Sequence, residues 1–213
     1  MNAGIANLRN DYKLKALNEA EVKDDAIEQF TIWWDEALQS EIYDVNAMTL
    51  ATADAAGNPL ARIVLLKDYT NEGFVFFTNY NSRKGKELSE NPRGCLLFFW
   101  KELERQVRIE GTIEKVDASE SDAYFHSRPE GSRIGAWTSP QSSAIPDREF
   151  LENKYLELSE SYRDQPIPRP DHWGGYIVKP AKIEFWQGRP SRLHDRILYT
   201  KQESGWKIER LAP

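Results

Sequence analysis

The chain has 213 residues, and its 34 acidic and 28 basic side chains give a formal net charge of −6 at pH 7. This acidic balance excludes the overall positive field with which proteins attract nucleic acid or anionic membrane surfaces, so we expect neither partner. One cysteine and three scattered histidines exclude a disulfide framework and the usual zinc motifs, so we also expect no metal.

Two local features bear on cellular location. The longest apolar run, residues 95–100, is too short to cross a bilayer. The first residues include Arg9 and Asp11 and lack the apolar core of a secretion signal. We therefore expect a cytoplasmic protein.

The first half of the chain predicts one amphipathic helix followed by a series of strands. We expect residues 1–20 to form a flexible segment and residues 24–41 to form the helix. The apolar stripe of this helix consists of Ile27, Phe30, Trp34 and Leu38. Segments rich in β-branched and aromatic residues predict strands over 47–54, 60–69, 74–80, 94–101 and 104–116. Before the fourth of these strands, Ser82 is a typical N-cap for a short helix that ends before Pro92.

The second half predicts two helices and a return to strands. Helices are expected over 119–127 and 147–162, on either side of an irregular stretch interrupted by prolines and glycines. Further strands are expected over 175–178, 182–187, 197–201 and 206–210. Eight or nine short strands favour a mainly β protein, namely a closed or partly closed antiparallel barrel with peripheral helices. Barrels of this kind often exceed about 200 residues, so we assign residues 1–213 to one domain.

The sequence lacks the common catalytic motifs but places cations and small polar residues together in several segments. It contains no Gly-rich dinucleotide loop, Walker A loop, nucleophile elbow or Cys-x-x-Cys pair. In one segment Arg62 and Lys67 bracket an apolar strand, where their opposite parity would place them on opposite faces. In a second, Arg83 and Lys84 follow Ser82 at a helix start, where free backbone N–H groups favour a phosphate. Solvated charges at a helix cap are the alternative interpretation.

A third segment contains Tyr124, Arg128 and Ser132, spaced four residues apart. On one continuous helix these side chains would lie along one side, but Pro129 is more typical of the start of a new turn. The three groups therefore either converge at a junction between short helices or are unrelated surface residues.

Residues 183–196 form the most unusual stretch, because three arginines, a histidine and an aspartate follow an aromatic strand. A solvated hairpin is one interpretation. Arg192, His194 and Arg196 alternate, however, so a strand would place all three on one face and favour an anionic partner.

Residues 184–196 resemble the signature of the pyridoxamine 5'-phosphate oxidase family, which reads Glu-Phe-Trp, five residues, then Arg-Leu-His-Asp-Arg, and the match is complete. Further blocks agree in order along nearly the whole chain: Arg-Ile-Val-Leu-Leu-Lys at 62–67, Phe-Phe-Thr-Asn at 76–79, Ser-Arg-Lys at 82–84, Leu-Glu-Arg-Gln-Val at 103–107, Tyr-Phe-His-Ser-Arg-Pro at 124–129, Gly-Ala-Trp at 135–137, Gln-Ser-Ser at 141–143 and Arg-Leu-Ala-Pro at 210–213. The resemblance implies a homodimeric FMN-binding split barrel of Greek-key type, with FMN at the dimer interface. It also implies oxidation of pyridoxamine and pyridoxine 5'-phosphates to pyridoxal 5'-phosphate, a step of vitamin B6 metabolism in which O2 is reduced to H2O2.

The resemblance also implies the site residues. Those expected around FMN, with contributions from both chains, are Arg62, Ile63, Val64, Leu65, Leu66, Lys67, Phe77, Thr78, Arg83, Lys84, Gln106, Gln141, Ser142, Trp186 and Arg196. Those expected to bind the substrate are Arg9, Tyr12, Lys67, Tyr124, Arg128, Ser132, Arg192 and His194. Within this set, Arg9 and Tyr12 belong to an N-terminal lid, while Arg192 and His194 are the catalytic residues beside the pyridine ring. Phe77 stands where some relatives have tyrosine, so a backbone contact to FMN is expected there.

Two other classes of function remain as alternatives. A non-catalytic protein of the same fold would bind FMN or pyridoxal 5'-phosphate without turnover. A nucleic-acid module fits less well, because the arginines lie in an acidic chain without an extended basic stripe.

Overall fold

The computed structural model describes residues 12–213, and its contacts divide the chain into two compact units. Unit 1 contains Met1–Leu50, Cys95–Gly111 and Pro180–Pro213, and unit 2 contains Ala51–Gly94 and Thr112–Lys179. The chain passes from one unit to the other inside β-strands, so several strands contribute residues to both. The assignment of residues 1–213 to one domain stays a prediction.

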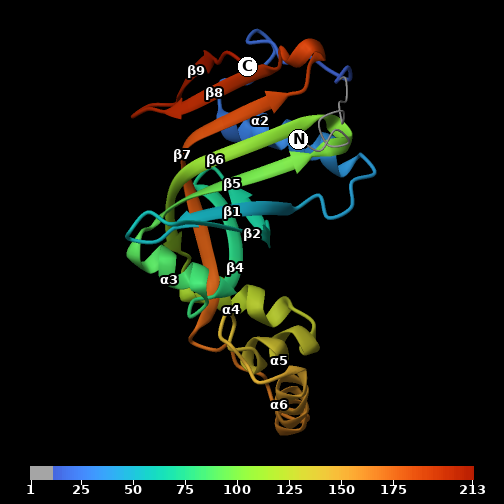
Figure 1. Cartoon of the computed structure of the whole chain (residues 1–213), viewed down its shortest axis with the longest axis vertical. Coiled ribbons are helices and arrows are strands. Elements are labelled where there is room, and N and C mark those ends of the chain that lie inside the picture. Colours follow the sequence, from blue (N-terminus) through green and yellow to red (C-terminus); the bar gives the residue numbers. More distant parts are fainter. Residues whose placement is uncertain (1–11) are drawn as a thin grey trace, which may run out of the picture. The chain divides into compact units, whose positions relative to one another are not determined.

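Nine strands are present among residues 12–213 (Figure 1). In chain order they are β1 (Ala47–Ala53), β2 (Pro59–Leu65), β3 (Asp68–Thr70), β4 (Gly73–Asn79), β5 (Arg93–Trp100), β6 (Arg105–Lys115), β7 (Trp173–Gln187), β8 (Asp195–Lys201) and β9 (Trp206–Arg210). Hydrogen bonds join them in the order β2-β1-β5-β6-β7-β4-β3, and β8 pairs with β7 and β9. Pairing of β4 with β7 and of β8 with its two neighbours is antiparallel, so the predicted mainly β class is confirmed.

Three predicted strands differ from the structure in their continuity. The strand predicted over 60–69 is interrupted, because β2 ends at Leu65 and the Lys67 N–H donates to the carbonyl of Val75 before β3 begins. The two strands predicted over 175–178 and 182–187 form one strand, β7. Pro180 is tolerated there because it lies between the residues that pair with β4 and those that pair with β8, where a missing N–H removes no bond to either.

Five α-helices occur among the described residues, and sequence analysis missed one of them. They are α2 (Ala26–Leu38), α3 (Arg83–Glu90), α4 (Ala118–Ser127), α5 (Glu130–Thr138) and α6 (Arg148–Ser161). The missed helix is α5, whose two glycines lower its intrinsic helix propensity. It is stabilised by burial, since Ile134 packs with Phe125 of α4 and Trp173 of β7 in one core cluster of unit 2. None of the helices in residues 12–213 is long and apolar enough to cross a membrane.

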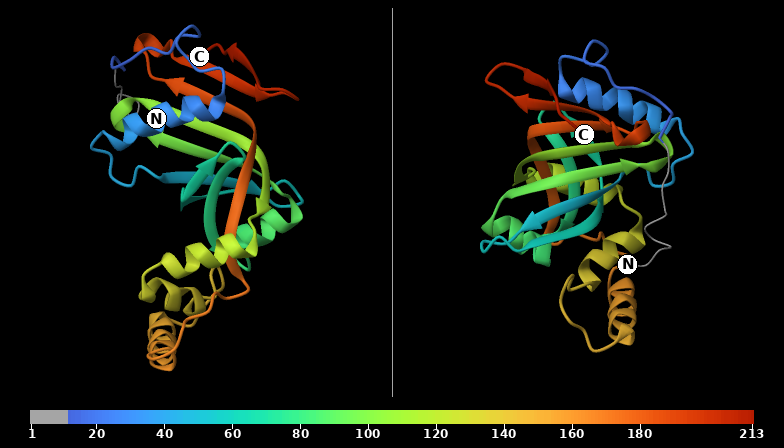
Figure 2. Two further views of the ribbon diagram at one scale, coloured as in Figure 1. Left: turned by 180° about the vertical axis from the view of Figure 1, so that it is seen from behind. Right: turned by 45° about the horizontal axis from the view of Figure 1, so that its top comes forward.

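In unit 1, α2 lies across the strands (Figure 2). Its aromatic side chains contact aromatic residues of those strands. Its N-cap Asp25 accepts hydrogen bonds from two backbone N–H groups of the first turn. Trp33 lies edge-on to Phe185 with ring centroids 5.2 Å apart, and Phe30 lies 5.5 Å from Phe98. The predicted apolar stripe was wrong at its end, because Leu38 is 55% exposed and the buried positions there are Trp33 and Ala37.

Unit 1 also buries a cation beside this helix. Arg105 is 4% exposed, and its Nε donates to Gln187 Oε1 at 2.9 Å. Its Nη1 donates to Glu36 Oε2, and its guanidinium lies 4.2 Å from the centroid of the Trp33 ring. Removal of any one of these interacting side chains destabilises the fold, because the polar groups that remain stay desolvated without a partner.

We expect Arg105→Ala to lower the free energy of unfolding by about 3 kcal/mol, because Gln187 stays buried and loses its donor. Urea denaturation followed by circular dichroism measures this change. Arg148→Ala is the matched control, since it removes an exposed ion pair with Glu152 whose side chains are 86% and 56% exposed. The control is expected to change stability by less than about 0.5 kcal/mol, and equal losses in the two variants would contradict the structural role of Arg105.

Candidate functional site

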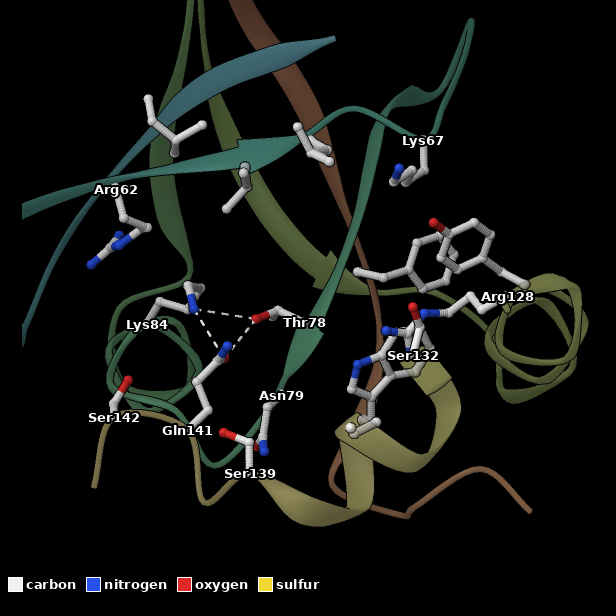
Figure 3. A pocket seen from close by; sticks show the side chains of 18 of the residues that line it. Arg62, Lys67, Thr78, Asn79, Lys84, Arg128, Ser132, Ser139, Gln141 and Ser142 are labelled. Atoms are coloured by element: carbon white, nitrogen blue, oxygen red, sulfur yellow. Dashed lines mark hydrogen bonds between the residues drawn. The ribbon is translucent and has the colours of Figure 1, made fainter. Parts of the chain in front are cut away.

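Unit 2 contains a cavity of about 870 Å³ that is lined by many of the predicted site residues (Figure 3). The predicted residues at its wall are Arg62, Ile63, Val64, Leu65, Lys67, Phe77, Thr78, Lys84, Tyr124, Arg128, Ser132, Gln141 and Ser142. Among the described residues of this wall, four are cationic and none is acidic. The cavity therefore favours an anionic ligand, and the same wall offers apolar surface from β2 and aromatic rings from β4 and α4.

At one end of the cavity, Lys84 forms a triangle of hydrogen bonds with two side chains. Its Nζ donates to Thr78 Oγ1 and to Gln141 Oε1, both at 3.2 Å, and Thr78 Oγ1 lies 3.2 Å from the same Gln141 oxygen (Figure 3). Burial and the nearby charge of Arg62 lower the pKa of Lys84, while Glu87 opposes this change. The triangle thus fixes an ammonium group and two polar side chains at the cavity wall.

Helix α3 positions Lys84 and the neighbouring arginines. Ser82 caps the helix, since its hydroxyl oxygen accepts from the Gly85 N–H at 3.3 Å, as the sequence predicts. Gly85 is required because a Cβ there would lie 2.0 Å from the carbonyl oxygen of Tyr80. The Arg62 side chain projects from β2 toward this helix and bonds to Thr52 and Glu87. Arg62 and Lys84 therefore lie at the same end of the cavity, beside the positive end of α3.

A second cationic group lies where α4 meets α5. Because α4 ends at Ser127 and α5 begins at Glu130, the junction brings Tyr124, Arg128 and Ser132 to one wall of the cavity. The convergent alternative from the sequence is therefore the correct one. Lys67 also lines this cavity. Because β2 ends at Leu65, the alternation of a regular strand, which would place Arg62 and Lys67 on opposite faces, does not extend to Lys67.

Arg128 has an unused donor in this wall. Its guanidinium lies 4.5 Å from the centroid of the Trp173 ring, and burial lowers its pKa. Its buried Nη1 has no hydrogen-bond partner in the part of the chain that the structure describes. A buried guanidinium nitrogen of this kind is ready to donate to a ligand oxygen.

Three aromatic rings support this second group. Phe77 stacks on Tyr124 with ring centroids 4.0 Å apart, and Phe77 also stacks on Trp173 at 5.6 Å. The stack holds the phenol of Tyr124 at the cavity wall. It also gives Phe77 a packing role that needs no hydroxyl group.

A further group of predicted site residues belongs to unit 1. Trp186 and His194 have ring centroids 4.6 Å apart, and Tyr12 lies edge-on to both at 5.7 and 5.8 Å. The backbone N–H of Arg189 donates to His194 Nδ1 at 3.1 Å, so the neutral imidazole carries its proton on Nε2. Burial and the charge of Arg192 lower the pKa of His194, which favours this neutral form.

A strand that places Arg192, His194 and Arg196 on one face, which is one of the two interpretations of this stretch, does not form. Pro190 begins a 3-10 turn over Pro190–Arg192, and β8 begins only at Asp195. Ser191 and Arg192 both adopt left-handed backbone conformations, with φ of 56° and 62°. Arg196, in contrast, lies in β8 directly opposite Trp186 of β7, and its guanidinium donates to the buried carboxylate of Glu184.

Several predicted residues lie elsewhere. Leu66 and Arg83 are not among the described residues that line the cavity. The Leu66 side chain is buried in the core, and the Arg83 side chain is 65% exposed. Gln106 lies in the part of β6 that belongs to unit 1. Arg9 lies outside the described residues.

Sequence analysis did not find Glu87 and Trp173. Glu87 pairs with Arg83 four residues earlier, a helical spacing that gives a detectable charge signal. The Trp173 ring contacts Phe77 and Arg128, which lie more than forty residues away in the sequence, and no local pattern identifies these contacts.

Comparison with known proteins identifies the family. Residues 34–162 match the family model described as pyridoxamine 5'-phosphate oxidase. Residues 173–213 match the model described as pyridoxine 5'-phosphate oxidase C-terminal dimerisation region.

Individual proteins agree with these matches. The chain is 57% identical over 214 residues to a pyridoxine/pyridoxamine 5'-phosphate oxidase of Trichormus variabilis, with full coverage of both chains. It is 58% identical over 210 residues to pyridoxine/pyridoxamine 5'-phosphate oxidase 1 of Ralstonia nicotianae, covering 98% of this chain and 99% of the other. Among solved structures, PhzG from Burkholderia lata, in complex with tetrahydrophenazine-1-carboxylic acid, is similar with a TM-score of 0.89 and 28% identity, covering 96% and 100% of the two chains. The chain therefore belongs to the pyridoxamine 5'-phosphate oxidase family.

Proposed function

We propose that the chain is an FMN-dependent oxidase that converts pyridoxamine 5'-phosphate and pyridoxine 5'-phosphate into pyridoxal 5'-phosphate, with reduction of O2 to H2O2. Full-length relatives named pyridoxine/pyridoxamine 5'-phosphate oxidase support the reaction and the substrate class. The observation that carries the proposal is one cavity with two cationic groups, one beside α3 and one at the junction of α4 and α5. A cofactor and a substrate that each carry a phosphate require such a pair of sites.

The group beside α3 fits the phosphate end of FMN. Arg62 and Lys84 offer charged donors at the cavity wall, and Arg83 lies on the same helix turn. Thr78 and Gln141 offer neutral hydrogen-bonding groups next to them, while residues 63–65 offer an apolar wall for a flat ring. When bound, FMN supplies the acceptor for the hydride that leaves the substrate carbon.

The group at the α4–α5 junction fits the substrate phosphate. Arg128 presents a buried nitrogen without a partner in the described chain, and Ser132 and Tyr124 place hydroxyl groups at the same wall. Lys67 adds a second positive charge. The four side chains thus combine charge with directed donors, as phosphate binding requires.

The residues of unit 1 take part through dimerisation in this proposal. The match to a dimerisation region covers Trp186, Arg192, His194 and Arg196. In a homodimer with FMN at the interface, a second copy of the chain contributes these groups to the ligand, together with Gln106. Arg192 and His194 lie against the pyridine ring and orient the carbon that is oxidised. The neutral His194 offers an Nε2–H donor for this purpose, and Tyr12 packs beside it as part of a lid.

Turnover under air tests the proposed function. The purified yellow protein is expected to convert pyridoxamine 5'-phosphate into pyridoxal 5'-phosphate with one H2O2 released per aldehyde formed. A flavin-loaded wild-type protein that forms neither product would contradict the oxidase and favour a non-catalytic FMN or pyridoxal 5'-phosphate binding protein.

Arg192→Ala is expected to lower kcat/KM about a hundredfold while FMN stays bound, because the variant loses a group that orients the pyridine ring of the substrate.

We expect Arg128→Ala to raise KM for pyridoxamine 5'-phosphate roughly thirtyfold, since loss of charged hydrogen bonds to a phosphate costs about 2 kcal/mol. Steady-state kinetics with the phosphorylated substrate measure this effect. Pyridoxamine without the phosphate is the control substrate, and its weak turnover is expected to be the same in both proteins. An unchanged KM for the phosphorylated substrate would contradict the assignment of Arg128.

A further inference from the structure

Glu87 is a buried carboxylate beside the cavity that the proposed reaction does not use. It lies in the middle of α3 and is 4% exposed. Its Oε2 accepts from Arg62 Nη2 at 2.9 Å and from the Thr52 hydroxyl, and its Oε1 accepts from Arg83 Nε at 3.1 Å. Both carboxylate oxygens are therefore engaged, and each arginine is held by a different one.

The contacts around Glu87 form a closed arrangement. Arg62 Nη1 donates to the Thr52 hydroxyl oxygen while the Thr52 hydroxyl donates to Glu87, so the guanidinium is fixed at two of its nitrogens. Burial raises the pKa of the Glu87 carboxyl, but the hydrogen bonds from Thr52 and Arg62 outweigh burial and leave that pKa below its ordinary value. The carboxylate is thus charged at neutral pH, and it fixes the direction of Arg62 before any ligand arrives.

Burial of a carboxylate is costly unless its partners repay the lost hydration. An apolar residue would fill the same position of α3 without that cost, so packing alone does not explain Glu87. The partners of Glu87 are Arg62, which the proposed function assigns to the phosphate of FMN, and Arg83, which lies on the same turn of α3 as Lys84. Its position therefore points to a role in arranging those cations.

We propose that Glu87 is a positioning residue that holds Arg62 and Arg83 in the arrangement that receives the phosphate of FMN; this inference rests on the proposed function. Glu87 also sets the charge of the cluster. Arg62, Arg83 and Lys84 carry three positive charges, and one carboxylate leaves a net charge of two, which matches a phosphate dianion. Without it, the two guanidinium groups repel each other and lose the orientation that a bidentate contact requires.

Flavin titration of the apoprotein tests the role of Glu87, with FMN and riboflavin as paired probes and quenching of flavin fluorescence as the readout. Riboflavin lacks the phosphate, so it reports on the remainder of the site. Glu87→Leu is expected to weaken FMN binding about tenfold or more and to leave riboflavin binding unchanged. Glu87→Gln keeps an acceptor oxygen without the charge, so it is expected to restore part of the lost preference for FMN. Glu90→Leu, at an exposed position of the same helix, is the control and is expected to bind both flavins as the wild type does.

The possible outcomes separate the positioning role from simple packing. A Glu87→Leu variant that binds both flavins normally, or loses both equally, overturns the proposal, because a structural defect does not distinguish the phosphate. If this variant does not fold, as judged by thermal melting of the apoprotein, the Glu87→Gln variant decides. A Glu87→Gln variant that prefers FMN over riboflavin as strongly as the wild type does overturns the proposal. A wild-type protein that does not bind FMN overturns the proposed function and the role of Glu87 together, whereas normal FMN binding with an unaffected Glu87→Leu variant overturns the role of Glu87 alone.

Discussion

Positive charge gathered at the wall of one cavity is the constraint on which the site in unit 2 depends. Lysine and arginine side chains that leave water lose hydration and repel one another, so each needs a compensating contact. For Arg62 the compensating contact is the carboxylate of Glu87. For Lys84 it is the pair of hydrogen bonds to Thr78 and Gln141, and for Arg128 it is the ring of Trp173. The cavity wall itself remains cationic, so the compensation fixes the side chains without removing the attraction for an anionic ligand.

Two interruptions of regular structure bring these cations together. The end of β2 at Leu65 frees Lys67 from the alternation of a strand, and the break between α4 and α5 turns Arg128 and Ser132 toward one wall. The first interruption is stabilised by the hydrogen bond from the Lys67 N–H to the carbonyl of Val75. The second is stabilised by the core cluster in which α4, α5 and β7 pack together. The site therefore depends on where the strands and helices stop as much as on where they run.

Local patterns in the sequence predict most of the strands and the cap of α3, because alternation, turn residues and N-caps act over a few residues. Grouping of Arg62 with Lys84 required the family resemblance, since contacts between distant segments leave no periodic signal. α5 was missed because its glycines oppose a helix that tertiary burial of Ile134 stabilises. For the stretch before β8 the sequence left a hairpin and a strand open, and the turn at Pro190–Arg192 excludes a strand that places Arg192, His194 and Arg196 on one face.

The crystal structure of the protein with FMN and pyridoxal 5'-phosphate tests the central claim most directly, because that claim assigns two phosphates to two cationic groups of one cavity. The FMN phosphate is predicted to contact Arg62 and Lys84, and the pyridoxal phosphate is predicted to contact Arg128 and Ser132. Binding of either phosphate outside this cavity, or an exchange of the two positions, would contradict the account.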